Sequence, residues 1–224
     1  MTGAPSPGTG TGTTVVDLVS VNVARPSLLG WQRGRPVRSG IAKRPVTQAR
    51  LRLGRLNLEG DGQADLRVHG GPDKAVYAYP SEHLGPWSEE LGQQLGPAAF
   101  GENLTTAGWL EDDVRIGDRW VWGEAELEVC QPRWPCFKLA MFRHQGDIGA
   151  RMRRLGRTGW YLRVLRPGQV PVAGPIEVAF RHPAGLTVAD AHWARLQGGE
   201  QLDGLVALAP LADNWRSELE RRAG

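Results

Sequence analysis

The chain has 224 residues, of which 41% are hydrophobic and 23% charged, with a formal net charge of +3 and a pI near 9.2. This composition excludes an intrinsically disordered chain and suits one β-rich domain, or one domain with a small appendage, built around an ample core. No apolar run is long enough for a membrane helix, and no basic region followed by an apolar one opens the chain. We therefore expect a cytoplasmic protein with no membrane partner. Its mild basicity suits an anionic small ligand at least as well as nucleic acid.

The first quarter of the chain begins with a polar segment and continues with strand patterns. Residues 1–13 consist mostly of Gly, Thr, Ser and Pro and are predicted to be a disordered tail. Residues 14–24 alternate as a strand does, and a loop is expected from there to about Lys43. The segment ARLRLGRLNL is expected to be a second strand, with Leu51 and Leu53 on one side.

Strand patterns dominate the middle of the chain. One hairpin, RWVWGEAELEVCQ, is expected to turn at Gly123-Glu124 and to point Ala125, Leu127 and Val129 inward. The other expected elements are strands at 75–79, 100–108, 159–168 and 174–180, a short helix opened by Ser81 that Gly85-Pro86 would interrupt, and a basic helix at 147–157 ended by Gly156. These elements predict a curved or closed β-structure with a few helices across its openings.

The periodicity changes at Leu186, where three short helices are predicted, the first capped by Thr187. The predicted fold is therefore mainly β with α (α+β), with a β-barrel-like domain at 14–184 and a small three-helix C-terminal unit at 185–224. Three short helices are compatible with a DNA-binding helix-turn-helix, but the segment has no short turn motif and no recognition face rich in Arg, Lys or Asn. We therefore expect no nucleic-acid partner.

The stretch QPRWPCFKL, residues 131–139, contains the first candidate functional residue. Pro135 suits the first position of a helix, which would place Cys136 in the first turn, facing unpaired N–H groups and the positive end of the helix dipole. Arg133 and Lys138 add positive charge, and this setting favours a thiolate that attacks electrophiles or binds soft metals. The alternative is a small buried apolar residue. Cys130 is expected on the opposite face from the inward residues of its strand and is interpreted as structural; two cysteines this close argue against a disulfide scaffold.

A second candidate is His69, which precedes Gly70-Gly71-Pro72 and is expected on a loop at a strand end. From the residues alone, the favoured interpretation of His69 is a histidine that hydrogen-bonds the turn. Upstream, Glu59, Asp61 and Asp65 lack the spacing of a calcium loop, so calcium is not expected.

Three blocks occur in this order: VHGGPDKAVYAYP, FGENLTT and GDRWVWGEAELEVCQPRWPCFKL. They resemble the MOSC domain, named for the C-terminal domain of molybdenum cofactor sulfurase, and in particular its YiiM-type branch, which resists toxic N-hydroxylated purines. The resemblance extends from the first strand to GPIEVAF, and the last segment is similar to the three-helix domain that follows MOSC in that branch. The resemblance implies a β-barrel-like fold, a molybdenum–molybdopterin cofactor, and a detoxifying reductase that converts substrates such as 6-N-hydroxylaminopurine to the amine.

The resemblance also implies roles for individual residues. Cys136 matches the protein ligand to molybdenum. Lys43, in SGIAKRPV, falls where the branch carries a functionally important lysine, and His69 lies in its VHGGPD block; both are candidate proton donors. Asn103, in FGENL, matches a position that contacts the cofactor in related reductases. Arg133 and Lys138 are assigned to cofactor binding from proximity and charge.

Two other functions, sulfur transfer and cofactor transfer, are alternatives to the reductase. Cys136 could instead carry sulfur as a persulfide, or the chain could bind the cofactor and hand it on without chemistry of its own. No lysine lies in an evident Schiff-base setting, which argues against pyridoxal phosphate. The expected partners are a small N-hydroxylated substrate and an electron-donor reductase of the flavin or iron–sulfur type, and a homodimer is left open. Trp134, between Arg133 and Pro135, departs from the family pattern at the rim of the expected pocket.

Overall fold

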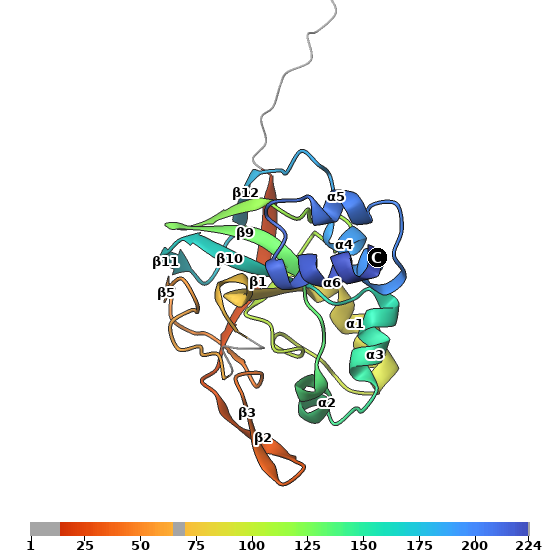
Figure 1. Ribbon diagram of the computed structural model, residues 1–224. Coiled ribbons are helices and arrows are strands. Elements are labelled where there is room, and N and C mark those ends of the chain that lie inside the picture. The colour runs from red at the N-terminus through yellow and green to blue at the C-terminus, as the bar shows by residue number, and fades with distance from the viewer. Residues whose placement is uncertain (1–13, 65–69, 224) are drawn as a thin grey trace, which may run out of the picture.

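Seven strands close into a barrel in the computed structural model, which describes residues 14–64 and 70–223 (Figure 1). The order around the barrel is β12, β8, β9, β10, β6, β7 and β1, and β1 pairs back with β12. These strands are β1 (Val15–Val23), β6 (Val76–Pro80), β7 (Leu104–Ala107), β8 (Arg119–Trp122), β9 (Ala125–Pro132), β10 (Trp160–Arg166) and β12 (Ile176–Phe180). All the pairings around the ring are antiparallel except that of β6 with β7. The predicted closed β-structure is confirmed.

Two small pairings extend the barrel. Strand β4 (Arg44–Pro45) pairs with the C-terminal end of β1, and β5 (Arg50–Leu53) pairs with β11 (Gly168–Pro171). Leu51 and Leu53 are both buried on one side of β5, as their alternation predicts.

A projecting hairpin replaces the loop predicted between residues 25 and 43, so that prediction is wrong. Strands β2 (Ser27–Gln32) and β3 (Arg35–Ser39) pair antiparallel and extend away from the barrel (Figure 1). Both turn residues, Arg33 and Gly34, have positive φ angles of 49° and 74°, as a two-residue hairpin turn that matches strand twist requires. Arginine seldom occupies the first of these positions, so the sequence carries a weak turn signal. We call residues 27–39 the arm.

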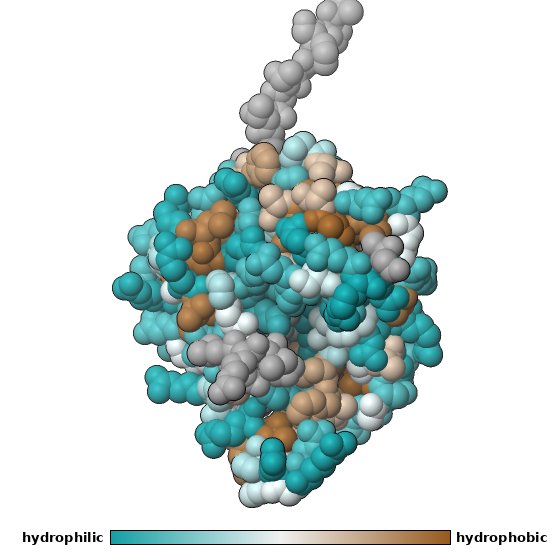
Figure 2. Space-filling view, viewed as in Figure 1, coloured by the Kyte–Doolittle hydropathy of each residue, from teal (hydrophilic) through white to brown (hydrophobic). Residues whose placement is uncertain are grey.

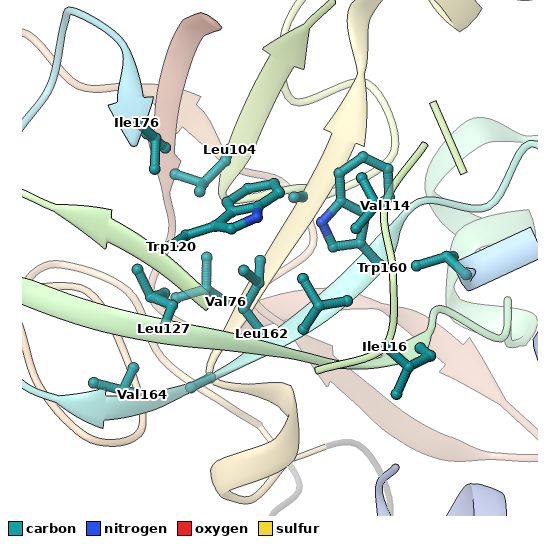
Figure 3. Packing of buried hydrophobic residues seen from close by; sticks show 14 of the residues in the cluster. Val76, Leu104, Val114, Ile116, Trp120, Leu127, Trp160, Leu162, Val164 and Ile176 are labelled. Atoms are coloured by element: carbon teal, nitrogen blue, oxygen red, sulfur yellow. The ribbon is translucent and has the colours of Figure 1, made fainter. Parts of the chain in front are cut away.

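The barrel interior is filled by aliphatic side chains and tryptophans (Figure 3). Trp120 and Trp160 pack edge to face, with ring centroids 6.0 Å apart. Ala125, Leu127 and Val129 are fully buried on the inner face of β9, as predicted.

Helices α1 (Leu84–Leu91), α2 (Phe137–Arg143) and α3 (Ile148–Leu155) form a second apolar cluster with Tyr79 and Phe100. Two 3-10 turns, η1 (Pro72–Lys74) and η2 (Ser81–His83), precede β6 and α1. Helix α1 runs through Gly85-Pro86, where an interruption was expected, because Pro86 lies in the first turn and its missing N–H has no helical partner there. Gly156 ends α3 in the left-handed conformation, as predicted.

The C-terminal helices α4 (Val188–Gln197), α5 (Leu202–Val206) and α6 (Asp213–Ala223) pack against the barrel. Thr187 and Asp190 form a capping box at the start of α4, with reciprocal bonds of 3.0 and 2.8 Å. Leu205, Trp215 and Leu219 belong to the same buried cluster as the barrel interior. Within 14–64 and 70–223, no helix has both the length and the apolar character that crossing a membrane requires.

Trp215 provides a test of this shared core. Replacing this fully buried ring by alanine leaves a large cavity, so Trp215→Ala should lower the free energy of unfolding by about 3–5 kcal/mol. The matched control is Trp31→Ala, because the Trp31 side chain on the arm is 65% exposed and its loss should cost under about 0.5 kcal/mol. Chemical denaturation of both variants makes the comparison, and equal losses would contradict a core shared by the barrel and the C-terminal helices.

Candidate functional site

A cleft lies at the rim of the barrel, between the base of the arm and the start of α2. Its lining is drawn from the segments 39–43, 57–64, 74–77, 100–103 and 133–138, together with Tyr161, and Asp61 is the one carboxylate among the described lining residues. Of the residues predicted to be functional, the cleft brings together Lys43, Asn103, Arg133, Cys136 and Lys138. His69 lies outside the described residues, and its predicted role stays a prediction.

Cys136 lies at the junction between the end of β9 and the start of α2. The helix begins at Phe137, two residues later than predicted, and Cys136 is its N-cap in extended conformation (φ −116°, ψ 173°). The carbonyl of Pro135 accepts a 3.4 Å hydrogen bond from Arg153, and that of Cys136 accepts from the Leu139 N–H at 3.0 Å. The thiol side chain is partly exposed and lines the cleft. The structure thus places an accessible sulfur among cationic side chains.

Cys130 has the structural position predicted for it. It is completely buried, and its thiol donates to the carbonyl oxygens of Asp73 and Tyr161, at 3.3 and 3.5 Å. Burial raises the pKa of the Cys130 thiol far above its usual range. The two cysteines therefore differ sharply in their access to reagents.

Lys43 is held against the cleft wall by Asp61, a residue that sequence reasoning considered only as a calcium ligand. Both side chains are nearly buried, and the ammonium group donates a short hydrogen bond to one Asp61 oxygen. The other oxygen accepts from the Asn103 amide at 2.8 Å. Burial lowers the pKa of Lys43, while Asp61 and Glu102 oppose the shift. Lys43 is thus a fixed ammonium group that releases its proton more readily than a solvated lysine.

Asn103 joins this pair to the barrel. Its amide donates to the Asn22 carbonyl at 3.2 Å as well as to Asp61, and its amide oxygen accepts from the Tyr77 N–H at 3.1 Å. Both donor hydrogens are therefore engaged within the chain, which makes Asn103 a positioning residue for Asp61. Its predicted contact with a cofactor stays a prediction.

Glu102 is a second residue that sequence reasoning missed, although it stands in the FGENL block. It is fully buried and accepts from the N–H groups of Ala98 and Phe100, at 2.7 and 3.0 Å, and from the Thr105 hydroxyl at 3.0 Å. Burial raises the pKa of Glu102, and these hydrogen bonds oppose the shift. Its carboxyl group organises the loop that carries Asn103 into the cleft.

Arg133 is a buried cation at the inner end of the cleft. Its guanidinium lies 5.2 Å from the centre of the Tyr77 ring, contacts the Met152 sulfur at 3.7 Å and bonds the Tyr161 hydroxyl. Burial raises the pKa of both phenols, so these neighbours remain neutral. The described residues offer Arg133 no carboxylate partner. A buried charge with neutral neighbours is costly unless an anion joins it, so the cleft is suited to an anionic occupant.

The remaining cations stand nearer the rim. Lys74 and Lys138 are half-buried there, and burial lowers the pKa of Lys74. In the described part of the lining, four cationic side chains face a single carboxylate, that of Asp61. The cleft therefore has a positive potential, which favours phosphate and thiolate groups.

The C-terminal helices support the wall that carries Cys136. The guanidinium of Arg195 lies 4.1 Å from the centre of the Trp134 ring and 4.8 Å from that of Trp215. On another side, Arg153 lies 5.4 Å from the Trp134 ring centre. These cation–π contacts hold the residue that precedes Pro135 and Cys136. Trp134 is thus fixed by α3, α4 and α6, an arrangement that its position in the sequence did not indicate.

The chemistry of the cleft combines one accessible sulfur, one buried guanidinium and one ammonium group of lowered pKa. Among the described residues, no group of three or more His, Cys, Asp or Glu side chains is placed to hold a metal ion. A metal that arrives with its own ligand can still be bound through a single thiolate, since thiolate is the soft ligand that such metals prefer. The cationic side chains would then neutralise an anionic carrier of that metal.

Comparison with known proteins agrees with this arrangement. The MOSC domain model matches residues 65–177. The chain is 40% identical to YflK of Bacillus subtilis over 208 residues, covering 92% of this chain and 93% of YflK. It is 38% identical to YiiM of Escherichia coli over 209 residues, covering 90% and 91% of the two chains. The crystal structure of YiiM from Geobacillus stearothermophilus superposes with a TM-score of 0.78 at 32% identity, covering 93% of this chain and all of that one. The seven-stranded barrel is thus that of a MOSC domain, and the chain belongs to the MOSC domain family.

Proposed function

We propose that the protein is a molybdenum-cofactor-dependent reductase that removes oxygen from N-hydroxylated nucleobases or related N-hydroxylated compounds, for example 6-N-hydroxylaminopurine to adenine. The observation that carries the proposal is the accessible thiol of Cys136 in a cleft whose buried guanidinium, Arg133, has neutral neighbours. A protein of Gibberella moniliformis named as a reductase is 38% identical over 107 residues, or 46% of this chain and 19% of that protein. This partial likeness supports reductive chemistry. Detoxification would be the biological role.

The residues present fit a molybdenum–molybdopterin cofactor. Cys136 would ligate the metal, and Arg133 and Lys138 would bind the anionic pterin and its phosphate. When bound, the cofactor supplies two-electron oxygen-removal chemistry. Asn103 would act through Asp61, which it holds by the 2.8 Å bond, and so keep Lys43 in place.

The reaction also requires the chain to deliver a proton to the substrate. Reducing R–NHOH to R–NH₂ and water breaks one N–O bond and consumes two electrons and two protons. A proton must reach the departing oxygen, and Lys43 lines the cleft with a lowered pKa that suits a general acid. His69 is the other candidate. The electrons come from a separate donor of the flavin or iron–sulfur type.

The first prediction uses the contrast between the two cysteines. In the cofactor-free protein, iodoacetamide should alkylate Cys136 and leave Cys130 unmodified, because Cys130 is fully buried and burial raises its pKa. Peptide mass spectrometry identifies the labelled site. Cofactor loading should block labelling, and the Cys130→Ala control should label like the native chain. Faster modification of Cys130 would contradict the assignment.

The second prediction concerns the metal ligand. Cys136→Ser should abolish turnover and molybdenum retention while leaving the fold intact, because a hydroxyl is a harder and less acidic ligand than a thiol. Metal analysis, pterin analysis and an assay of adenine formation from 6-N-hydroxylaminopurine measure these effects, with Cys130→Ala as the matched control. A serine variant with native turnover would contradict the proposal. Sulfur transfer without bound molybdenum would favour the persulfide alternative, and cofactor release without substrate reduction would favour a carrier.

The third prediction separates proton donation from charge at residue 43. Lys43→Ala should lower turnover roughly a hundredfold, and Lys43→Arg should be nearly as slow although it keeps the positive charge, because a guanidinium does not release its proton near neutral pH. In the native enzyme, turnover per bound molybdenum should fall as pH rises through the lowered pKa of Lys43, since the acid must be protonated. Both variants should lose that limb of the pH profile. Native turnover in Lys43→Arg would exclude Lys43 as the general acid, and His69 would then be the remaining candidate for that role.

A further inference from the structure

The arm presents an exposed surface of unusual composition beside the cleft. Leu28 and Trp31, both on the arm, are 53% and 65% exposed, and exposed apolar side chains that gather on one element within a polar rim are typical of an interaction surface. Arg33, Arg35 and Arg38 surround them and are exposed as well. The arm therefore has an apolar centre with a cationic border.

Acidic residues are missing from the two segments that meet here. Residues 18–58 contain nine Lys and Arg residues and no Asp or Glu, and residues 129–146 contain three Lys and Arg residues and again no Asp or Glu. The first segment supplies the arm and the Lys43 wall of the cleft; the second supplies α2 and the Cys136 wall. Basic residues are spread along the whole chain, but the fold places these two acid-free segments on either side of the cleft.

The exposed arginines of the arm are not neutralised by the described part of the chain, although Arg38 donates a 3.1 Å hydrogen bond to the Pro26 carbonyl. Within the described residues, Arg25, Arg33, Arg35, Arg38 and Arg44 form no ion pair with a carboxylate. Arginines at positions 119, 151, 166 and 221 have acidic partners, whereas the exposed Arg154 and Arg222 have none among the described residues. The charge of the arm is thus available to a partner.

The arm and α2 form one continuous surface. The two elements are in contact, and a side-chain carbon built at Gly30 would lie 2.8 Å from the Met141 methyl group. Phe137, the residue after Cys136, is 41% exposed. Figure 2 shows apolar surface over the arm and α2 in the lower part of the view, bordered by hydrophilic side chains. We call this surface, made by residues 27–39 and 137–143, the arm–α2 face.

We propose that the arm–α2 face docks an acidic electron-carrier protein with a flavin or an iron–sulfur cluster, and so delivers electrons at the mouth of the cleft. This inference rests on the proposed function, because reduction of one N–hydroxyl group requires two electrons from a donor. An apolar centre with a charged border is the composition of a transient protein interface. The arginines of the arm, with no acidic residue in the same segment, attract an acidic partner and repel a basic one. Phe137 places such a partner next to the residue that would ligate the metal.

The test measures binding and electron delivery separately. Purified acidic flavodoxin and plant-type [2Fe–2S] ferredoxin, each fluorescently labelled, are titrated with the cofactor-free protein at low and at physiological salt. We expect at least one of them to bind, with affinity falling as salt rises because exposed charges are screened. The double variant Arg33→Glu/Arg35→Glu should weaken that binding at least about tenfold, and Trp31→Ala should weaken it by roughly the same factor. The matched control is Arg154→Glu/Arg222→Glu, which makes the same charge change at exposed positions on α3 and α6 and should bind like the native chain.

Electron delivery is then assayed with the molybdenum-loaded enzyme. Turnover driven by the reduced protein donor should fall at least about tenfold in the arm variants, whereas turnover driven by reduced methyl viologen should stay native, since a small dye needs no docking surface. If viologen drives no turnover in the native enzyme or in any variant, the proposed reductase function fails. The titration still shows whether a carrier binds the arm–α2 face. The proposal is overturned if the dissociation constant of both carriers exceeds about 100 µM at low salt, or if the arm variants bind a carrier as tightly as the control does. It is also overturned if an oligonucleotide binds the face more tightly than either carrier, or if sedimentation shows that the face joins two copies of this chain.

Discussion

Closure of the barrel through β1 is the constraint on which the site depends. This strand pairs with β12 at its start, with β7 along its middle and with β4 at its end. The Asn22 N–H donates to the Asn103 carbonyl at 2.7 Å, so the end of β1 is tied to the block that carries Asn103. The chain leaves β1 at the rim of the barrel, where the arm, Lys43 and Asp61 follow. Hydrogen bonding of one strand therefore brings residues near position 43 to the wall opposite Cys136.

Charge balance in the cleft follows from how each cation is buried. Lys43 has Asp61 within hydrogen-bonding reach, and that pair is held by Asn103. Arg133 instead lies among phenol rings and a thioether, so its charge is compensated only when an anion enters the cleft. One cation is thus paired within the chain, and the other has only neutral side chains around it. Burial makes each charge more sensitive to its neighbours than it would be in water.

The C-terminal helices support the functional site as well as the hydrophobic core. Their apolar side chains complete the buried cluster of the barrel, and Arg195 contacts the ring of Trp134. A polypeptide segment of about 40 residues has too little apolar surface to form an independent core, which is a reason for it to bury its side chains elsewhere. Packing that stabilises these helices therefore also fixes the wall that carries Cys136.

The sequence by itself was sufficient for the local structure of most elements and for the choice of Cys136 over the buried Cys130 as the candidate site residue. Alternation placed Ala125, Leu127 and Val129 inside and Cys130 on the other face, and period and capping located the three C-terminal helices, because these signals act over a few neighbouring residues. The residue blocks around Cys136 also indicated the family. Only the tertiary structure could show that Asp61 holds Lys43, that Arg133 is buried among neutral rings, and that two acid-free segments form one face. These facts depend on contacts between residues far apart in the chain, and no local pattern encodes which distant side chain a buried charge will meet. The arm was missed for a related reason: its turn has an arginine at positive φ, a conformation that the paired strands impose on a residue that does not favour it.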